Sequence, residues 1–123
     1  MTGVQTCALP ISVWLDGGHN PDAGTALARH FAGQRLHLVV GMLANKSPLA
    51  LVEPLGETLA SVQVVAVPGK ESHEAAAFGP QARGAADVAD ALRALPGDGL
   101  PVLVAGSLYL AGEVLRLNRE FPD

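Results

Sequence analysis

Residues 13–21 read Val-Trp-Leu-Asp-Gly-Gly-His-Asn-Pro, and this stretch decides the fold. Its first residues are apolar on both sides of a pleat, which is typical of a short strand covered on both faces. Two glycines then predict a turn. Asn20 followed by Pro21 indicates a helix start, because asparagine accepts from free backbone amides and proline fits the first helical position. The stretch therefore predicts a strand, a turn and a helix, with Asp16 and His19 at the junction.

The same alternation continues along the chain. The hydrophobic pattern predicts strands over residues 12–15, 36–42, 61–67 and 100–105, and helices over residues 21–32, 48–60, 85–95 and 108–121. Pro54 and Gly56 predict a kink or an early end in the second helix. Residues 68–84 are expected to form a loop with a single helical turn. Strands and helices at this spacing predict an α/β fold with a Rossmann-like, mostly parallel sheet flanked by helices.

The composition describes one compact domain. A chain of 123 residues is long enough for one domain with a core and too short for two. Apolar residues make up 49% and charged residues 16%, which argues against a disordered chain. The net charge of −4 argues against a nucleic-acid surface, which needs clustered lysine and arginine. No uninterrupted apolar run reaches the roughly 18 residues that predict a membrane span.

The first eleven residues do not resemble a protein element. Met1–Ile11 reads MTGVQTCALPI, which resembles the translation of a common short-read sequencing adapter with GTG taken as the start codon. We therefore expect residues 1–11 to be an assembly artefact and residues 12–123 to be the C-terminal domain of a longer protein. A secretory leader is the alternative, but the stretch lacks a basic n-region and a long apolar core. The only cysteine, Cys7, lies here, so no disulfide framework is expected.

Polar residues stand where three of the expected strands end: residues 16–20, 45–47 and 106–107. Ligands bind outside the carboxyl ends of strands in α/β sheets, so this agreement predicts a site at one edge of the sheet. Asp16 could accept from the two vicinal hydroxyls of a ribose, or it could form a turn by binding its own backbone.

The other polar residues each carry two interpretations. His19 could donate to a phosphate or carboxylate near the helix N-terminus, or it could be a loop histidine. Lys46 could meet an anion or remain a solvated lysine. Ser107 could face a ligand or serve as the N-cap of the closing helix, and Gly106 could admit a ligand or only form the turn.

Several motifs are missing from the sequence. It has no Gly-x-x-x-x-Gly-Lys-Ser/Thr loop and no Gly-x-Gly-x-x-Gly after the first strand, so nothing here is expected to cradle a triphosphate. His30, His37 and His73 lack metal-ligand spacing, which argues against a zinc site. No serine, histidine and aspartate can be grouped as a nucleophile with its base from the sequence.

Two motifs carry a family resemblance. Leu15–Pro21 (LDGGHNP), followed by Val104–Val114 (VAGSLYLAGEV), resembles the folylpolyglutamate synthase/dihydrofolate synthase family of Mur-ligase-like enzymes. Gly41–Lys46 (GMLANK) also looks like the loop after the second strand of that family. The resemblance covers residues 13–121 and implies the C-terminal domain of such an enzyme, with a Mur ligase C-terminal fold.

Members of this family add L-glutamate to dihydropteroate or folate through an acyl phosphate made at the expense of ATP. The resemblance implies ATP and Mg²⁺ as cofactors of the full-length parent, engaged through upstream domains, with no metal ligand in this piece. It also implies a cytoplasmic enzyme of folate biosynthesis without nucleic-acid or membrane partners. The piece alone is expected to be inactive.

The resemblance also implies roles for individual residues. Asp16 would bind the ATP ribose, while His19 and Ser107 would be catalytic, near the reacting phosphate and the incoming glutamate. Weaker candidates for substrate binding are Asn20, Lys46 and Tyr109.

Two other functions remain open. One is the C-terminal domain of a different Mur-type amide ligase, against which the pairing of the His-Asn-Pro and Gly-Ser-Leu-Tyr motifs argues. The other is a free-standing α/β binding module without catalysis. A phosphate-binding loop encoded a few hundred residues upstream would favour a ligase over such a module.

Overall fold

The computed structural model describes residues 4–6, 13–16 and 21–120, with side chains for residues 13–16 and 22–116. The elements in chain order are β1 (Val4–Thr6), β2 (Val13–Asp16), α1 (Pro21–His30), β3 (Leu36–Val40), α2 (Leu49–Leu55), η1 (Gly56–Thr58), β4 (Leu59–Val64), η2 (Ala75–Phe78), β5 (Ala82–Gly84), α3 (Val88–Arg93), β6 (Val102–Ala105) and α4 (Leu108–Glu120). The predicted α/β fold is confirmed.

The strands of the described residues form one sheet in the order β1-β2-β6-β3-β4-β5. The strand β1 runs antiparallel to β2, and every other neighbouring pair is parallel. The carboxyl ends of β2, β6 and β3 therefore lie side by side, and we call this end of the strands the carboxyl edge of the sheet. The amino ends of the same strands lie at the opposite end, which we call the amino edge.

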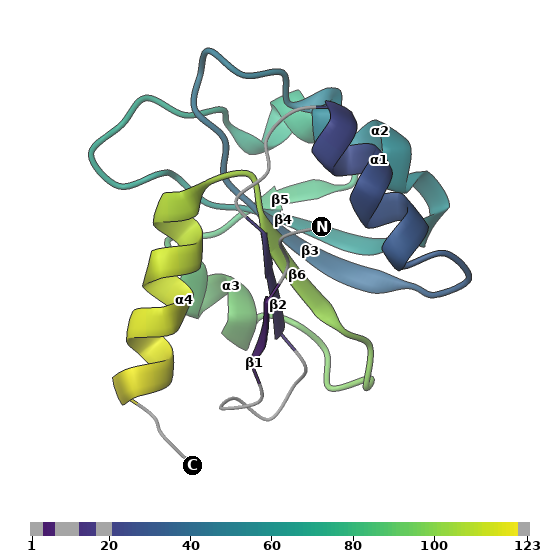
Figure 1. Cartoon of the computed structure of the whole chain (residues 1–123). Helices are drawn as coiled ribbons and strands as arrows, with labels where there is room; N and C mark the ends of the chain where they lie inside the picture. The colour runs from purple at the N-terminus through teal and green to yellow at the C-terminus, as the bar shows by residue number, and fades with distance from the viewer. Residues whose placement is uncertain (1–3, 7–12, 17–20, 121–123) are drawn as a thin grey trace.

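Helices cover both faces of the sheet, with α1 and α2 on one face and α3 and α4 on the other (Figure 1). Each face has its own apolar cluster. Leu27 of α1 and Leu51 of α2 belong to the first, while Val88 of α3 and Val114 of α4 belong to the second. The strand β3 feeds both clusters, because successive side chains of a strand point to opposite faces: Leu38 joins the first and Val39 the second.

The structure corrects several predicted boundaries. The strand β4 covers Leu59–Val64, earlier than the predicted 61–67, and β5 lies inside the predicted loop 68–84. The expected helical turn in that loop is η2. The sequence does not reveal β5, because a three-residue edge strand with only Ala82 partly buried has almost no hydrophobic alternation.

The helix ends have local causes. The helix α2 ends at Leu55, with Pro54 inside it and Gly56 after it at a φ of 44°, so the predicted early end is confirmed. The helix α3 is shorter than the predicted 85–95, because Asp87 caps it by accepting from the backbone N–H of Asp90 at 2.8 Å. Across the described residues, no helix combines the length and apolar character needed to cross a membrane.

Two glycines allow close packing of the chain where β3 and β6 end. Gly106 has a φ of 98°, and a Cβ added to it would lie 2.7 Å from the carbonyl oxygen of Gly41. A Cβ on Gly41 would lie 2.7 Å from the carbonyl oxygen of Val65. The backbone at Gly106 therefore packs directly against the backbone at Gly41. A side chain at either glycine would prevent the close packing seen here.

Candidate functional site

The predicted site lies at the carboxyl edge of the sheet. In the register of the sheet, Asp16 at the end of β2 is level with Ala105 of β6, and Ala105 is level with Val40 of β3. Gly106 and Ser107 follow β6 directly, and Gly41–Lys46 follows β3. The structure thus brings the ends of three neighbouring strands together, as the sequence predicts.

Asp16 is almost enclosed at this edge. Its residue is 4% exposed, and it already has an interaction partner within the chain. A ligand hydroxyl that binds Asp16 must therefore share or replace that interaction. A carboxylate has about four acceptor sites on its two oxygens, so it can hold an internal partner and a ligand together.

Ser107 is 5% exposed and has a definite structural partner. Its Oγ accepts from the backbone N–H of Tyr109 at 3.1 Å, in the first turn of α4. This is the N-cap interaction that the sequence analysis named as the alternative to a ligand contact. The hydroxyl keeps its own proton and a second lone pair, so the cap does not exhaust its hydrogen-bonding capacity.

Two loops cover the same edge, after β3 and after β4. The Nε2 of His73 donates to the carbonyl oxygen of Lys46 at 2.6 Å, and the backbone N–H of Ala44 donates to the carbonyl oxygen of Glu71 at 2.9 Å. A bridge between Leu43 and Ser72 lies next to the contact between Ala44 and Glu71. Lys46 is thus held through its backbone, and its side chain takes no part in this contact.

The loop after β4 brings in a residue that the sequence did not suggest. The Nζ of Lys70 lies 5.8 Å from the centre of the Tyr109 ring, a distance compatible with a cation–π contact. Tyr109 is 52% exposed, and Leu108 beside it is 76% exposed. Lys70 comes from a Gly-Lys pair in an irregular loop, so only the folded chain reveals that it lies over the first turn of α4.

Two predicted site residues cannot be placed. His19 and Asn20 lie outside the described residues. The described residues contain no group of three or more His, Cys, Asp or Glu side chains that could hold a metal ion. The edge therefore offers a buried carboxylate, a capped hydroxyl, two lysines and an exposed tyrosine as groups for a ligand.

Comparison with models of known protein families shows to which family this chain is related. The family model described as Mur ligase, glutamate ligase domain, matches residues 2–108. The chain belongs to this family. The match to the Mur ligase domain begins inside the stretch that we expect to be adapter-derived, and that expectation stays a prediction. No curated protein matches the domain significantly.

Solved structures similar to this Mur ligase domain are folylpolyglutamate synthases. The enzyme from Thermotoga maritima has a TM-score of 0.80 at 24% identity, covering 94% of this chain and 30% of that one. The Mycobacterium tuberculosis enzyme complexed with ADP and AMPPCP has a TM-score of 0.76 at 24% identity, covering 94% and 31%. The bifunctional folylpolyglutamate synthase/dihydrofolate synthase from Yersinia pestis has a TM-score of 0.77 at 27% identity, covering 89% and 29%.

These matches confirm the predicted resemblance and the Mur ligase C-terminal fold. The chain spans less than a third of the length of these enzymes. Their nucleotide, metal and glutamate sites thus belong to proteins with large parts that have no counterpart in this domain.

Proposed function

We propose that this domain is the C-terminal part of an ATP-dependent ligase that joins L-glutamate to dihydropteroate or folate through an acyl phosphate. The observation that carries the proposal is the meeting of Asp16 and Ser107 at the ends of adjacent strands, in a domain of the glutamate ligase family. Because the reaction consumes ATP, we expect the parent to work in the cytoplasm.

Each residue of the edge has a task in this proposal. Asp16 accepts from the ribose hydroxyls of ATP, as carboxylates at strand ends do in other α/β folds. Ser107 lies at the start of α4, a helix of 13 residues whose free N-terminal amides favour an anionic group nearby. His19 joins Ser107 at the reacting phosphate and the incoming glutamate.

The remaining candidates bind rather than react. Lys46 supplies a positive charge for a carboxylate or phosphate, and Asn20 and Tyr109 bind the substrates. A similar solved enzyme, a bifunctional folylpolyglutamate synthase/dihydrofolate synthase, was crystallised with Mn, AMPPNP and L-glutamate. We propose ATP and Mg²⁺ for the parent of this domain, where the ion would neutralise phosphate charge.

The metal ligands are expected to come from outside the described residues, because these offer no cluster for a cation. The exposed Leu108 and Tyr109 would then face the upstream domains when the parent closes over its substrates. Closure of this kind excludes water, which would otherwise hydrolyse an acyl phosphate.

The test of this function uses both the chain and its full-length parent. The purified 123-residue chain is expected to show no ATP hydrolysis and no glutamate–folate amide formation. In the parent, Asp16→Ala is expected to raise the KM for ATP about tenfold or more, equivalent to one lost charge-assisted hydrogen bond, and to leave the KM for glutamate within about twofold.

Steady-state kinetics with ATP and L-glutamate varied separately make the measurement. Asp22→Ala is the matched control, because Asp22 is an exposed carboxylate in the first turn of α1. Ligase turnover by the chain alone would contradict the proposed dependence on upstream domains. An unchanged ATP KM in Asp16→Ala would remove Asp16 from the ribose.

A further inference from the structure

The opposite edge of the sheet contains a polar group of its own. His37 of β3 is 3% exposed and is bonded through both ring nitrogens. Its Nδ1 lies 2.6 Å from the Oγ of Ser61 on β4, and its Nε2 lies 2.9 Å from Oδ2 of Asp98 in the turn before β6. Ser61 and Asp98 are 24 and 61 residues away from His37 in the sequence.

The charge of Asp98 favours one direction for the hydrogen bonds of this group. The backbone N–H of Leu100 donates to Asp98 and lowers the pKa of that carboxyl, and the hydrogen bond with His37 lowers it further. Asp98 is thus an anion at neutral pH and accepts from Nε2 of His37. When Nε2 carries the only ring proton of His37, the lone pair of Nδ1 faces Ser61, whose hydroxyl is then the donor.

This is the hydrogen-bond order of an activated serine: hydroxyl, imidazole, carboxylate. A serine hydroxyl is a weak nucleophile until an adjacent base takes its proton, and the base works best when a third group holds its tautomer. In serine proteases the carboxylate binds Nδ1 and the serine faces Nε2, and here the two nitrogens are exchanged. The exchange leaves the chemistry intact, because either nitrogen of imidazole can be the acceptor.

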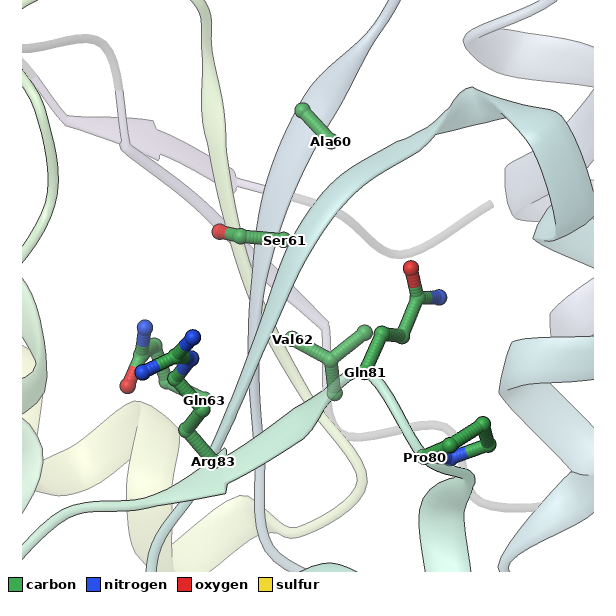
Figure 2. A pocket seen from close by; sticks show the side chains of 7 residues that line it. All are labelled: Ala60, Ser61, Val62, Gln63, Pro80, Gln81 and Arg83. Atoms are coloured by element: carbon green, nitrogen blue, oxygen red, sulfur yellow. The ribbon is translucent and has the colours of Figure 1, made fainter.

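Ser61 also lines a pocket formed by residues of β4 and by residues in and just before β5, the outermost strand on this side of the described sheet. The pocket has a volume of about 390 Å³ and is lined in addition by Ala60, Val62, Gln63, Pro80, Gln81 and Arg83. Figure 2 shows the side chains of Ser61, Gln63 and Arg83 on the same side of the two strands, with Val62 and Gln81 on the other. Gln63 and Arg83 are direct neighbours in the register of the sheet.

This side of the pocket suits an anion. Arg83 contributes a guanidinium group and Gln63 an amide, both of which donate hydrogen bonds. None of the described residues that line the pocket is acidic. The volume lies at the small end of the range of about 300–1,000 Å³ found for ligand sites.

We propose that Ser61 is a nucleophile that accepts acyl groups from activated esters bearing an anionic group, with His37 as its base and Asp98 as a positioning residue. In the first step, Ser61 Oγ bonds to the ester carbonyl carbon while its proton moves to Nδ1 of His37. The bond from that carbon to the leaving oxygen then breaks, and the leaving oxygen takes the proton from His37.

Water completes the cycle. His37 takes a proton from a water molecule, which attacks the acyl-serine, and the proton returns to Ser61 Oγ as the carboxylic acid departs. Arg83 pairs with the anionic group of the ester, and Gln63 donates to the developing oxyanion. The site lies at the amino edge of the sheet, so it is independent of the proposed ligase function at the carboxyl edge.

Covalent labelling of the purified 123-residue chain tests the proposal. A fluorophosphonate probe is expected to phosphonylate Ser61, with loss of fluoride, at least about 100-fold faster than Ser47, an exposed serine without a histidine partner. Peptide mapping by mass spectrometry locates the adduct. Ser61→Ala is expected to remove it and Ser47→Ala to leave it unchanged.

Two further measurements separate a reactive centre from a structural one. Asp98→Asn is expected to slow the labelling of Ser61 about tenfold or more, because an amide no longer stabilises a protonated His37. With p-nitrophenyl succinate, Arg83→Gln is expected to slow p-nitrophenol release about tenfold, but not with the neutral p-nitrophenyl acetate.

The native chain alone can overturn the proposal. If Ser61 in the folded chain is labelled no faster than Ser47, the hydroxyl is not activated, whether or not the variants fold. If Ser61 is labelled but Asp98→Asn, shown to be folded by circular dichroism, reacts at the native rate, the assigned relay is wrong. Equal effects of Arg83→Gln on both esters would remove the preference for an anionic substrate.

Discussion

The two edges of the sheet hold polar groups that are built in opposite ways. At the carboxyl edge, Asp16 and Ser107 come from short motifs that follow strand ends, and loops lie over them. At the amino edge, His37 is hydrogen-bonded directly to both Ser61 and Asp98, and no two of the three residues share a motif. A hydrogen bond to backbone holds Ser107 at the first edge, whereas hydrogen bonds between side chains hold the group at the second.

This difference shows what each edge requires from the rest of the molecule. Ser107 is fixed by α4, and Gly41 and Gly106 fix the strand ends around it, so the carboxyl edge depends on backbone geometry. The amino edge depends on side-chain partners across β3 and β4. Changes to backbone conformation should therefore damage the first edge more, and changes to charge should affect the second more.

The largest expected effect is at Gly106, where the backbone argument is strongest. Gly106→Ala would place a methyl group 2.7 Å from the carbonyl oxygen of Gly41 at a φ of 98°. Strain and the clash with backbone together should lower the free energy of unfolding by about 3 kcal/mol or more. Urea denaturation of the chain makes the measurement.

Gly33 provides the matched control, because it has a φ of 79° and nothing within 4 Å of an added Cβ. Gly33→Ala should lower the free energy of unfolding by about 1 kcal/mol, from the positive φ alone. Equal losses in the two variants would mean that the close approach of β3 and β6 does not govern the carboxyl edge.

The sequence predicted the carboxyl edge of the sheet better than the amino edge. The strand–turn–helix at residues 13–21 and the Gly-Ser motif at 106–107 are local patterns, and they predicted the sheet and the edge where Asp16 meets Ser107. The strand β5 was missed because an edge strand of three residues has almost no alternation to detect. Lys70 was missed because only the fold brings its loop to Tyr109.

The hydrogen-bonded group of His37, Ser61 and Asp98 at the amino edge could not be predicted from the sequence, for a different reason. His37 had no metal-ligand spacing, and no serine or aspartate near it in sequence suggested a partner. Its contact with Ser61 depends on the register in which β3 pairs with β4, where the two residues are level. Such a register is set by the packing of whole strands, which a reading of single motifs does not provide.

Substitution of Ser107 should lower the free energy of unfolding less than substitution of Gly106, because it removes only one N-cap hydrogen bond. Ser107→Ala removes the acceptor for the backbone N–H of Tyr109 and should lower the free energy of unfolding by about 1 kcal/mol. Ser107→Asn retains a good N-cap and should stay within about 0.5 kcal/mol of the native chain. Urea denaturation distinguishes the two variants.

The same pair of variants separates capping from catalysis in the full-length parent. If the hydroxyl acts at the reacting phosphate, both variants should lower kcat about 100-fold, as the loss of a donor to a developing charge does in other enzymes. If only Ser107→Ala lowers kcat, the N-cap alone accounts for the loss of activity, and Ser107 is not catalytic.

The smallest expected change in stability is at Asp98, because its carboxylate is solvent-exposed and water screens its charge. Its pKa is lowered from 3.8 by the backbone N–H of Leu100 and by His37, so its ionised form stabilises the fold. A lowered pKa gives stability that is present above pH 3.8 and lost as the pH falls through the folded-state pKa. Asp98→Asn should therefore unfold at lower urea than the native chain near pH 7, and the difference between the two urea midpoints should narrow as the pH falls below 3.8. Asp22→Asn is the control, since Asp22 is an exposed carboxylate at the other edge.

A difference in urea midpoint between Asp98→Asn and the native chain that stays constant with pH would mean that the shape of the Asp98 side chain, and not its charge, holds the turn against His37. That result would weaken the case for an anion behind the imidazole, and with it the contrast between the two edges.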